Sequence, residues 1–156
     1  MIVTVNGLLA ACRARVRDVA VLRDQLDDLE DNMTRLGGGG LTGVAVQHSL
    51  GDAFAAYVGR RDDVSRRLMD AQRRLAAEQT AVILLTDDLP REKRELLRSY
   101  YCYRAGVTKL SEELHCTISN VYKRLTAARE ALAGVTEEDV ESKLPGWYTK
   151  GGMDDA

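Results

Sequence analysis

The sequence contains little proline, few aromatic residues and no long apolar run. Two of its 156 residues are proline, and aromatic residues make up 5%. No stretch approaches ~18 uncharged apolar residues, so we expect no transmembrane helix. The short apolar run at the amino terminus has no basic segment before it, which makes it a poor signal peptide. Since Ala, Leu, Arg, Asp and Glu dominate the long runs, we expect an all-α, cytoplasmic protein.

Cysteine is also scarce, and the usual marks of a catalytic centre are missing. Cys12, Cys102 and Cys116 form an odd set without CxxC spacing, for which reduced thiols are the simplest interpretation. His115 and Cys116 with Cys102 would make three metal ligands, but no fourth stands at a usual spacing, so we expect no metal site. The sequence lacks a Gly-rich phosphate loop, paired His ligands and a nucleophile with its base. We therefore expect neither an enzyme nor a cofactor.

Positive charge is concentrated in one part of the chain, although the net charge is −2. Residues 1–88 carry 11 basic and 13 acidic side chains, and residues 134–156 carry 2 and 6. Residues 89–133 carry 9 and 5, a local net charge of +4. Phosphate binding needs a local excess of cations, and this segment has one. The excess is mild and does not decide the matter alone.

Residues 1–88 are predicted to form a long antiparallel helical hairpin that resembles a coiled coil. The run Gly37–Gly40 is expected to end the first helix. Residues 41–48 are expected to be part of a loop, with a brief strand or a helical turn as the alternatives. Ser49 and Asp52 have capping-box spacing at the expected start of the second helix. The apolar stripes are Leu8, Cys12, Val19, Leu22, Leu26, Leu29, Met33 and Leu36 in the first helix, and Phe54, Tyr57, Val64, Leu68, Ala71, Leu75, Val82 and Leu85 in the second.

Two helices alone make a thin core, so these stripes need a further partner. We expect a second hairpin from another subunit, which gives a homodimer or a higher homo-oligomer. Three arginine pairs also lie along the second helix between residues 60 and 74. They form either a stripe for nucleic acid or a solvated face balanced by nearby aspartates, and the solvated face is the favoured interpretation.

Residues 89–133 have the pattern of a helix-turn-helix. A helix is expected from Arg91 to about Arg104, and Gly106 breaks it. Thr108 is expected to cap a short helix over residues 109–114, and Thr117 a longer one through Ala131. Apolar residues would lock the two short helices at a steep angle, and a small residue lets their backbones approach. Leu110, Ser111, Leu114, Cys116, Val121 and Leu125 stand at the required offsets of 0, 1, 4, 6, 11 and 15.

The segments L-P-R-E-K-R-E-L-L-R-S-Y-Y and G-V-T-K-L-S-E-E-L-H-C-T-I-S-N-V-Y-K-R-L-T-A-A-R-E-A-L carry a family resemblance. They resemble region 4 of sigma-70-type factors. They resemble more closely the phage-encoded regulators that join this module to a helical amino-terminal half, such as the ArpU and RinA groups of late-gene activators. The resemblance covers about 45 of the 156 residues. His115 departs from it where a turn glycine is usual, and Thr117 where serine is common.

The resemblance implies that the helix after Thr117 enters the major groove of double-stranded DNA. Ser119, Tyr122 and Lys123 would approach base edges, with Ile118 presented beside them. The neighbouring polar side chains would hold phosphates and set the register. The predicted DNA-binding residues are Lys109, Thr117, Ile118, Ser119, Asn120, Tyr122, Lys123 and Arg124.

Some of these residues have a purely structural role as the alternative. Thr117 would then only cap its helix, and Arg124 would pair with Glu113 or Glu130. Arg98 and Arg104 are further candidates for contacts with the DNA backbone. Nothing in residues 1–88 resembles a domain that melts promoter DNA, so we do not expect an independent initiation factor.

Residues 134–156 form an acidic tail. A short helix is expected after Thr136 and before Pro145, and residues 151–156 are expected to be disordered. Trp147 and Tyr148 stand together in a turn-rich context. They either form a docking peptide for RNA polymerase or another protein, or fold back onto the helical body.

Three functions remain open on the sequence. The first is a phage or prophage transcription regulator of the late-gene activator type that dimerises and binds DNA. The second is a packaging adaptor such as the small subunit of a phage terminase, which would oligomerise through the long helices and contact the large subunit. The third is a structural coiled-coil protein whose helix-turn-helix binds protein.

Overall fold

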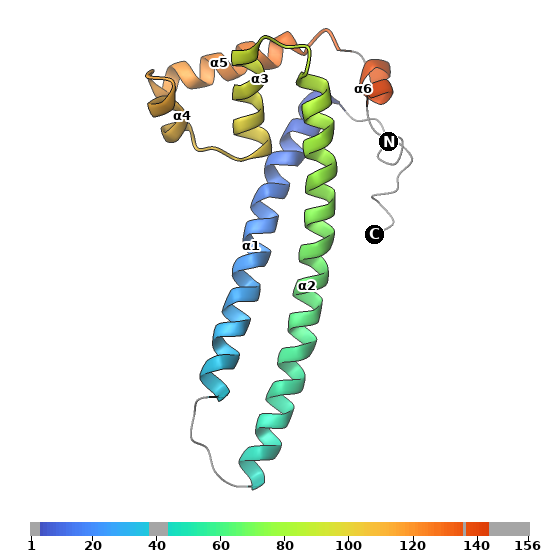
Figure 1. Cartoon of the computed structure of the whole chain (residues 1–156), viewed down its shortest axis with the longest axis vertical. Coiled ribbons are helices and arrows are strands. Elements are labelled where there is room, and N and C mark those ends of the chain that lie inside the picture. The colour runs from blue at the N-terminus through green and yellow to red at the C-terminus, as the bar shows by residue number, and fades with distance from the viewer. Residues whose placement is uncertain (1–3, 38–43, 136, 144–156) are drawn as a thin grey trace. The chain divides into compact units, whose positions relative to one another are not determined.

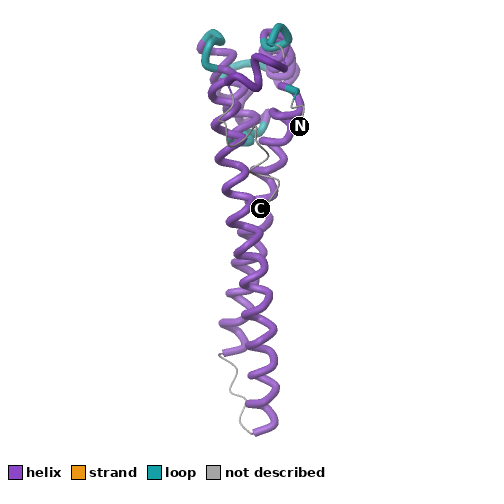
Figure 2. The backbone as a smooth tube through the Cα atoms, turned by 90° about the vertical axis from the view of Figure 1, so that its right-hand side faces the viewer, coloured by secondary structure: helices purple, strands orange, loops and turns teal. Residues whose placement is uncertain are grey.

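The computed structural model describes residues 4–37, 44–135 and 137–143, and every regular element among them is helical (Figures 1 and 2). This confirms the all-α class. The elements are α1 (Val5–Gly37), α2 (Val44–Thr86), α3 (Arg91–Leu97), the π-helical turn η1 (Arg98–Cys102), α4 (Val107–Glu113), α5 (Ile118–Ala131) and α6 (Glu137–Lys143).

The helices α1 and α2 lie side by side and antiparallel, as the predicted hairpin requires (Figures 1 and 2). α1 ends at Gly37, the first glycine of the predicted break. The predicted loop over residues 41–48 is wrong from Val44 onward, because α2 begins there. Ser49 and Asp52 consequently lie inside the helix rather than at its start. Gly51, inside α2, costs the helix only about 1 kcal/mol relative to alanine, which a helix of 43 residues tolerates.

The chain divides into two compact units. The multi-helix unit takes in Met1–Arg17 and Arg73–Ala156, and the two-helix unit is Asp18–Gln72. The predicted domain boundary at residue 88 follows the end of α2, whereas the multi-helix unit also includes the last turns of α2 and the first turns of α1. The ends of both long helices therefore belong with the helix-turn-helix.

The multi-helix unit has one continuous apolar core. Four elements within residues 89–135, α3, η1, α4 and α5, contribute to it, and so do the start of α1 and the end of α2. Its buried members are Leu8, Leu9, Cys12, Ala81, Val82, Leu85, Leu96, Leu97, Tyr101, Cys102, Leu110, Val121, Leu125, Ala128 and Leu132. The short helices need this shared core, since helices of 7 residues are not stable alone in water.

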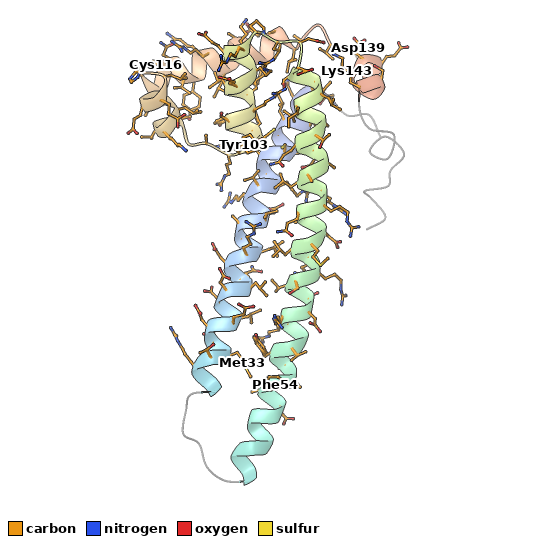
Figure 3. All side chains as sticks on the ribbon, viewed as in Figure 1. Met33, Phe54, Tyr103, Cys116, Asp139 and Lys143 are labelled. Atoms are coloured by element: carbon orange, nitrogen blue, oxygen red, sulfur yellow. The ribbon has the colours of Figure 1, made fainter. Side chains whose placement is uncertain are left out.

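The two-helix unit buries much less. Within residues 18–35 and 51–72, Val19 and Ala71 are buried, and the other apolar stripe positions are half-buried or exposed. Phe54 leaves 53% of its surface exposed. It lies near Met33 of α1 (Figure 3).

The arginine pairs of α2 point mostly to solvent. Arg60, Arg61, Arg66, Arg67 and Arg73 are exposed, and Arg74 is half-buried. Arg61 pairs with Glu30 of α1 at 3.7 Å, and Arg67 pairs with Asp63 at 3.2 Å. These contacts fit the interpretation as a solvated, charge-balanced face.

The short helix α6 lies where the acidic tail was predicted to be helical. Lys143 at its end donates to Asp88 at 2.9 Å, and this hydrogen bond lowers the pKa of Asp88 and raises that of Lys143. The predictions for Thr136, Pro145, Trp147, Tyr148 and residues 151–156 fall outside the described residues. Among the described residues, no helix has a stretch both long and apolar enough to cross a membrane.

Candidate nucleic-acid interface

The turn between α4 and α5 is closed by backbone hydrogen bonds. The His115 amide donates to the Glu112 carbonyl at 3.3 Å, and the Cys116 amide donates to the Ser111 carbonyl at 3.0 Å. This pair of bonds is a Schellman motif. His115 has a φ of 52°, the left-handed conformation that glycine usually supplies at this position. Histidine therefore makes the turn that the helix-turn-helix pattern assigns to glycine.

The first helix of the motif starts differently from the prediction. α4 begins at Val107, and Gly106 stands before it in extended conformation with no side-chain cap. Thr108 lies inside the first turn, where its carbonyl accepts a hydrogen bond from the Ser111 hydroxyl at 2.7 Å. The prediction that Thr108 caps the helix is therefore wrong. Glycine is itself an acceptable N-cap residue, which allows this earlier start.

Thr117 begins α5 as predicted. Its hydroxyl oxygen accepts a hydrogen bond from the Asn120 amide at 3.1 Å, which satisfies one of the free amides of the first turn. The threonine hydroxyl keeps its own proton to donate to a further acceptor. The capping role is thus confirmed and leaves a donor for a phosphate oxygen.

One side of α5 is fully committed to the core. Val121 and Ala128 are 0% exposed, Leu125 is 1% exposed and Leu132 is 3% exposed. These residues belong to the same buried cluster as Leu110 of α4, so the predicted lock between the two helices is present. Leu114, also predicted to belong to that lock, is less enclosed, with 37% of its surface exposed.

The opposite side of α5 is open. Ile118 and Tyr122 are four positions apart, and so are Ser119 and Lys123, so each pair is adjacent on the helix surface. All four side chains are exposed. The first turn of α5 contains no acidic residue, so nothing there repels an approaching phosphate.

The structure exposes every residue of the predicted DNA-binding set. Lys109 lies on α4 and makes a surface ion pair with Glu113 at 3.8 Å. Exposed pairs of this kind are weak, so the lysine can exchange its partner for a phosphate. Arg124 lines a groove together with Glu113. The exposed set is Lys109, Thr117, Ile118, Ser119, Asn120, Tyr122, Lys123 and Arg124.

Arg98 acts inside the protein instead of on its surface. Its guanidinium donates to the Thr86 hydroxyl at 3.0 Å and to the Ile83 carbonyl at 2.9 Å, and it pairs with Asp87 at 3.7 Å. Arg98 therefore fastens η1 to the end of α2, which argues against its predicted contact with DNA. Arg104 is exposed and has a φ of 51°, at the bend that follows η1.

Sequence reasoning missed the part that α1 plays in this unit. Arg13 donates to the Tyr100 carbonyl at 2.7 Å, and its guanidinium lies 3.7 Å from the centre of the Tyr100 ring. Gln79 of α2 donates to the Cys102 carbonyl at 2.8 Å. The available signal was Arg15, which interrupts the apolar stripe of α1 between Cys12 and Val19. Arg15 pairs with the buried Glu78 of α2 at 3.4 Å.

Two of the three cysteines meet in the core. Cys12 and Cys102 are both 0% exposed and belong to the same buried cluster. The neighbouring Cys102 thiol, and then burial, raises the pKa of Cys12. Cys116 is half-buried near the turn between α4 and α5 (Figure 3). In the part of the chain that the structure describes, no three His, Cys, Asp or Glu side chains are placed to hold a metal ion.

A groove of about 480 Å³ lies among α3, α4 and α5. Leu96, Leu110, Leu114 and Ala127 form its apolar lining. Its charged lining comes from Glu92, Lys93, Glu95, Glu113 and Arg124. The acidic residues outnumber the basic ones, so this groove is a poorer place for a phosphate backbone than the exposed face of α5.

Comparison with known proteins adds no name to this architecture. No family model, no curated protein and no solved structure matches the chain.

Proposed function

We propose that this chain is a sequence-specific DNA-binding transcription regulator of a phage or prophage, of the late-gene activator type, and that α5 docks in the major groove. The observation that carries the proposal is the exposed face of α5. Four side chains capable of base contacts, Ile118, Ser119, Tyr122 and Lys123, project from the amino-terminal turns of a helix whose other side is fixed in the core. A recognition helix needs one side that is packed in the core and another side that is exposed to the DNA.

Contacts with phosphates would come from both ends of the turn. Lys109 lies on α4, and Thr117, Asn120 and Arg124 lie at or near the start of α5. These side chains are exposed and polar, and such groups position a protein on the duplex. The local charge of residues 89–133, 9 basic against 5 acidic, supplies the attraction. Arg98 and Arg129 contribute less of it, because both make hydrogen bonds within the unit.

Self-association through the two-helix unit completes the proposal. Its apolar stripes are half-buried within one chain, and a second copy would cover them. A dimer would place two recognition helices on a two-fold or tandem site. RNA polymerase is the proposed partner of such a regulator, and the host cytoplasm its proposed place of action.

The test measures mass and DNA binding on one preparation. Light scattering gives the mass, and titrations with upstream and random duplexes at two salt concentrations give the affinity. We expect a dimer that prefers one duplex and binds more weakly as salt rises. A ring of eight or more subunits would favour the packaging adaptor, and a chain that binds no duplex would be a protein-docking module.

Two variants separate the contacts. Arg124→Ala should weaken binding to every duplex and reduce the salt slope by about 1. Lys123→Ala should weaken binding to the preferred duplex by about tenfold and change random duplexes less. Arg67→Ala is the matched control, because it removes one cation from an exposed ion pair of the two-helix unit. Equal losses for all three variants would contradict the assignment.

A further inference from the structure

Two apolar side chains stand out on the exposed face of α5. Ile118 exposes 44% of its surface and Tyr122 exposes 51%. They are separated by one helical turn, so their side chains are neighbours on the helix surface. The core-facing side of α5 is already filled by Val121, Leu125 and Ala128. Ile118 and Tyr122 are therefore not needed to hold α5 in place.

Polar and cationic groups surround this apolar pair. Ser119 and Lys123 stand beside it on the same face, both exposed, and Thr117 caps the same end of the helix. An apolar surface that docks protein usually has a larger continuous apolar area and fewer charges at its centre. The partner must offer small apolar groups at short intervals among hydrogen-bonding groups and negative charge.

The major groove of DNA presents such groups. Thymine carries a 5-methyl group there, beside acceptors and donors of the neighbouring bases. One helical turn advances ~5.4 Å, and successive base pairs are ~3.4 Å apart. Two side chains one turn apart can therefore reach methyl groups on adjacent or next-but-one base pairs.

We propose that Ile118 and Tyr122 contact thymine methyl groups, so that the DNA site of this chain contains thymines at one or two positions under the start of α5. This inference rests on the proposed DNA binding and adds the base that is read. Ser119 and Lys123 supply hydrogen bonds to the bases between and beside those thymines. The exposed apolar pair thus adds a preference for thymine to the base contacts that Ser119 and Lys123 make.

The experiment removes single methyl groups from the DNA. The full-length protein is first used to select a preferred site from a random duplex library. Each thymine of that site is then replaced by deoxyuridine, which keeps every hydrogen-bonding group and loses only the methyl. We expect about fourfold weaker binding at one or two positions and no change at the others, as for the loss of one buried methyl group.

Protein variants assign each methyl group to its side chain. Ile118→Ala should bind the thymine site about fourfold more weakly and should no longer distinguish thymine from deoxyuridine at one position. Tyr122→Ala should do the same at the second position, whereas Tyr122→Phe keeps the ring and should keep the discrimination. Tyr103→Ala is the control, because Tyr103 is 63% exposed and lies outside α5. The melting temperatures of the Ile118 and Tyr122 variants should match that of the parent protein, since neither of these two side chains belongs to the core.

The outcomes distinguish the two proposals. Specific DNA binding that ignores every deoxyuridine replacement would overturn the thymine inference and leave the regulator intact. A selected site without thymines under α5 would do the same. A protein that enriches no duplex would overturn both.

Discussion

The two units share the same pair of long helices, yet they bury their apolar residues to different extents. In the multi-helix unit, Cys12 of α1 and Val82 of α2 are both 0% exposed. In the two-helix unit, Leu26 and Leu29 of the same α1 stripe are only half-buried. Apolar spacing alone therefore gives an amphipathic helix, and further elements are needed to bury its apolar face. Residues 89–135 supply those elements in one unit, and a second copy of the chain is our proposal for the other.

The polar contacts also differ between the two units, and those of the multi-helix unit are the more buried. In the multi-helix unit, charged groups donate to backbone carbonyls of other elements, as Arg13 does to Tyr100 and Arg98 does to Ile83. In the two-helix unit, Arg61 makes an exposed ion pair with Glu30. Hydrogen bonds from charged groups in partly buried places stabilise a fold by roughly 1.5–3 kcal/mol, and exposed ion pairs by about 0–1 kcal/mol. These bonds fasten η1 to both long helices in the multi-helix unit, whereas the two-helix unit has stability to gain from a partner.

The largest contrast should come from core leucines. Leu97→Ala removes a side chain that is 0% exposed and should lower the free energy of unfolding by about 3 kcal/mol. Leu26→Ala removes a half-buried one and should cost about 1 kcal/mol. Urea denaturation at two protein concentrations measures both. If Leu26→Ala cost as much as Leu97→Ala at the lowest concentration, the two-helix unit would be enclosed within one chain.

The next contrast compares two arginines. Arg98→Met should lower the free energy of unfolding by about 2 kcal/mol, because Thr86 and Ile83 lose a charged donor. Arg67→Met breaks only the exposed pair with Asp63 and should change it by less than about 0.5 kcal/mol. Thermal melts of both variants provide the comparison. Indistinguishable melting temperatures would mean that Arg98 does not fasten η1 to α2.

A smaller contrast tests the two threonines for which capping was predicted. Thr117→Ala removes the acceptor of the Asn120 amide and should cost about 1 kcal/mol. Thr108→Ala should be close to neutral, because Thr108 lies inside α4 and Gly106 precedes the helix. Denaturation curves of the two variants give the difference directly. A larger loss for Thr108→Ala would reverse the assignment of the caps.

The smallest effect is expected at the turn. His115→Gly removes the strain of a left-handed residue that has a side chain, but it also adds freedom to the unfolded chain. We expect the free energy of unfolding to rise by about 0.5 kcal/mol. Differential scanning calorimetry would show a slightly higher melting temperature. A lower one would mean that the exposed imidazole makes contacts worth more than the backbone strain.

Local features of the fold could be predicted from the sequence, because their causes lie within a few residues. The cap at Thr117 and the buried side of α5, with Val121 and Leu125, follow from helix periodicity. The start of α2 could not be predicted as well, since a loop was the expectation for residues 41–48 and α2 begins at Val44. Gly106 was read as a break, and it also serves as the N-cap of α4.

Long-range partners could not be predicted, because periodicity shows which side of a helix is apolar and not what covers it. Cys12 fitted the hairpin stripe equally well, yet it lies in one core with Cys102. The inward role of Arg98 depends on Ile83 and Thr86, which meet it only in the folded chain. The exposed face of α5 was predicted because the resemblance and the spacing agreed there.

The contact between Arg13 and Tyr100 joins residues that are 87 positions apart, and this separation has a consequence for biosynthesis. At typical translation rates, Leu8 and Leu9 are made on the order of 10 s before the residues that cover them. During that interval the nascent chain displays an apolar helix side with no native cover. Ribosomes stalled before residue 100 should therefore carry a chain that binds chaperones, whereas the released full-length chain should not.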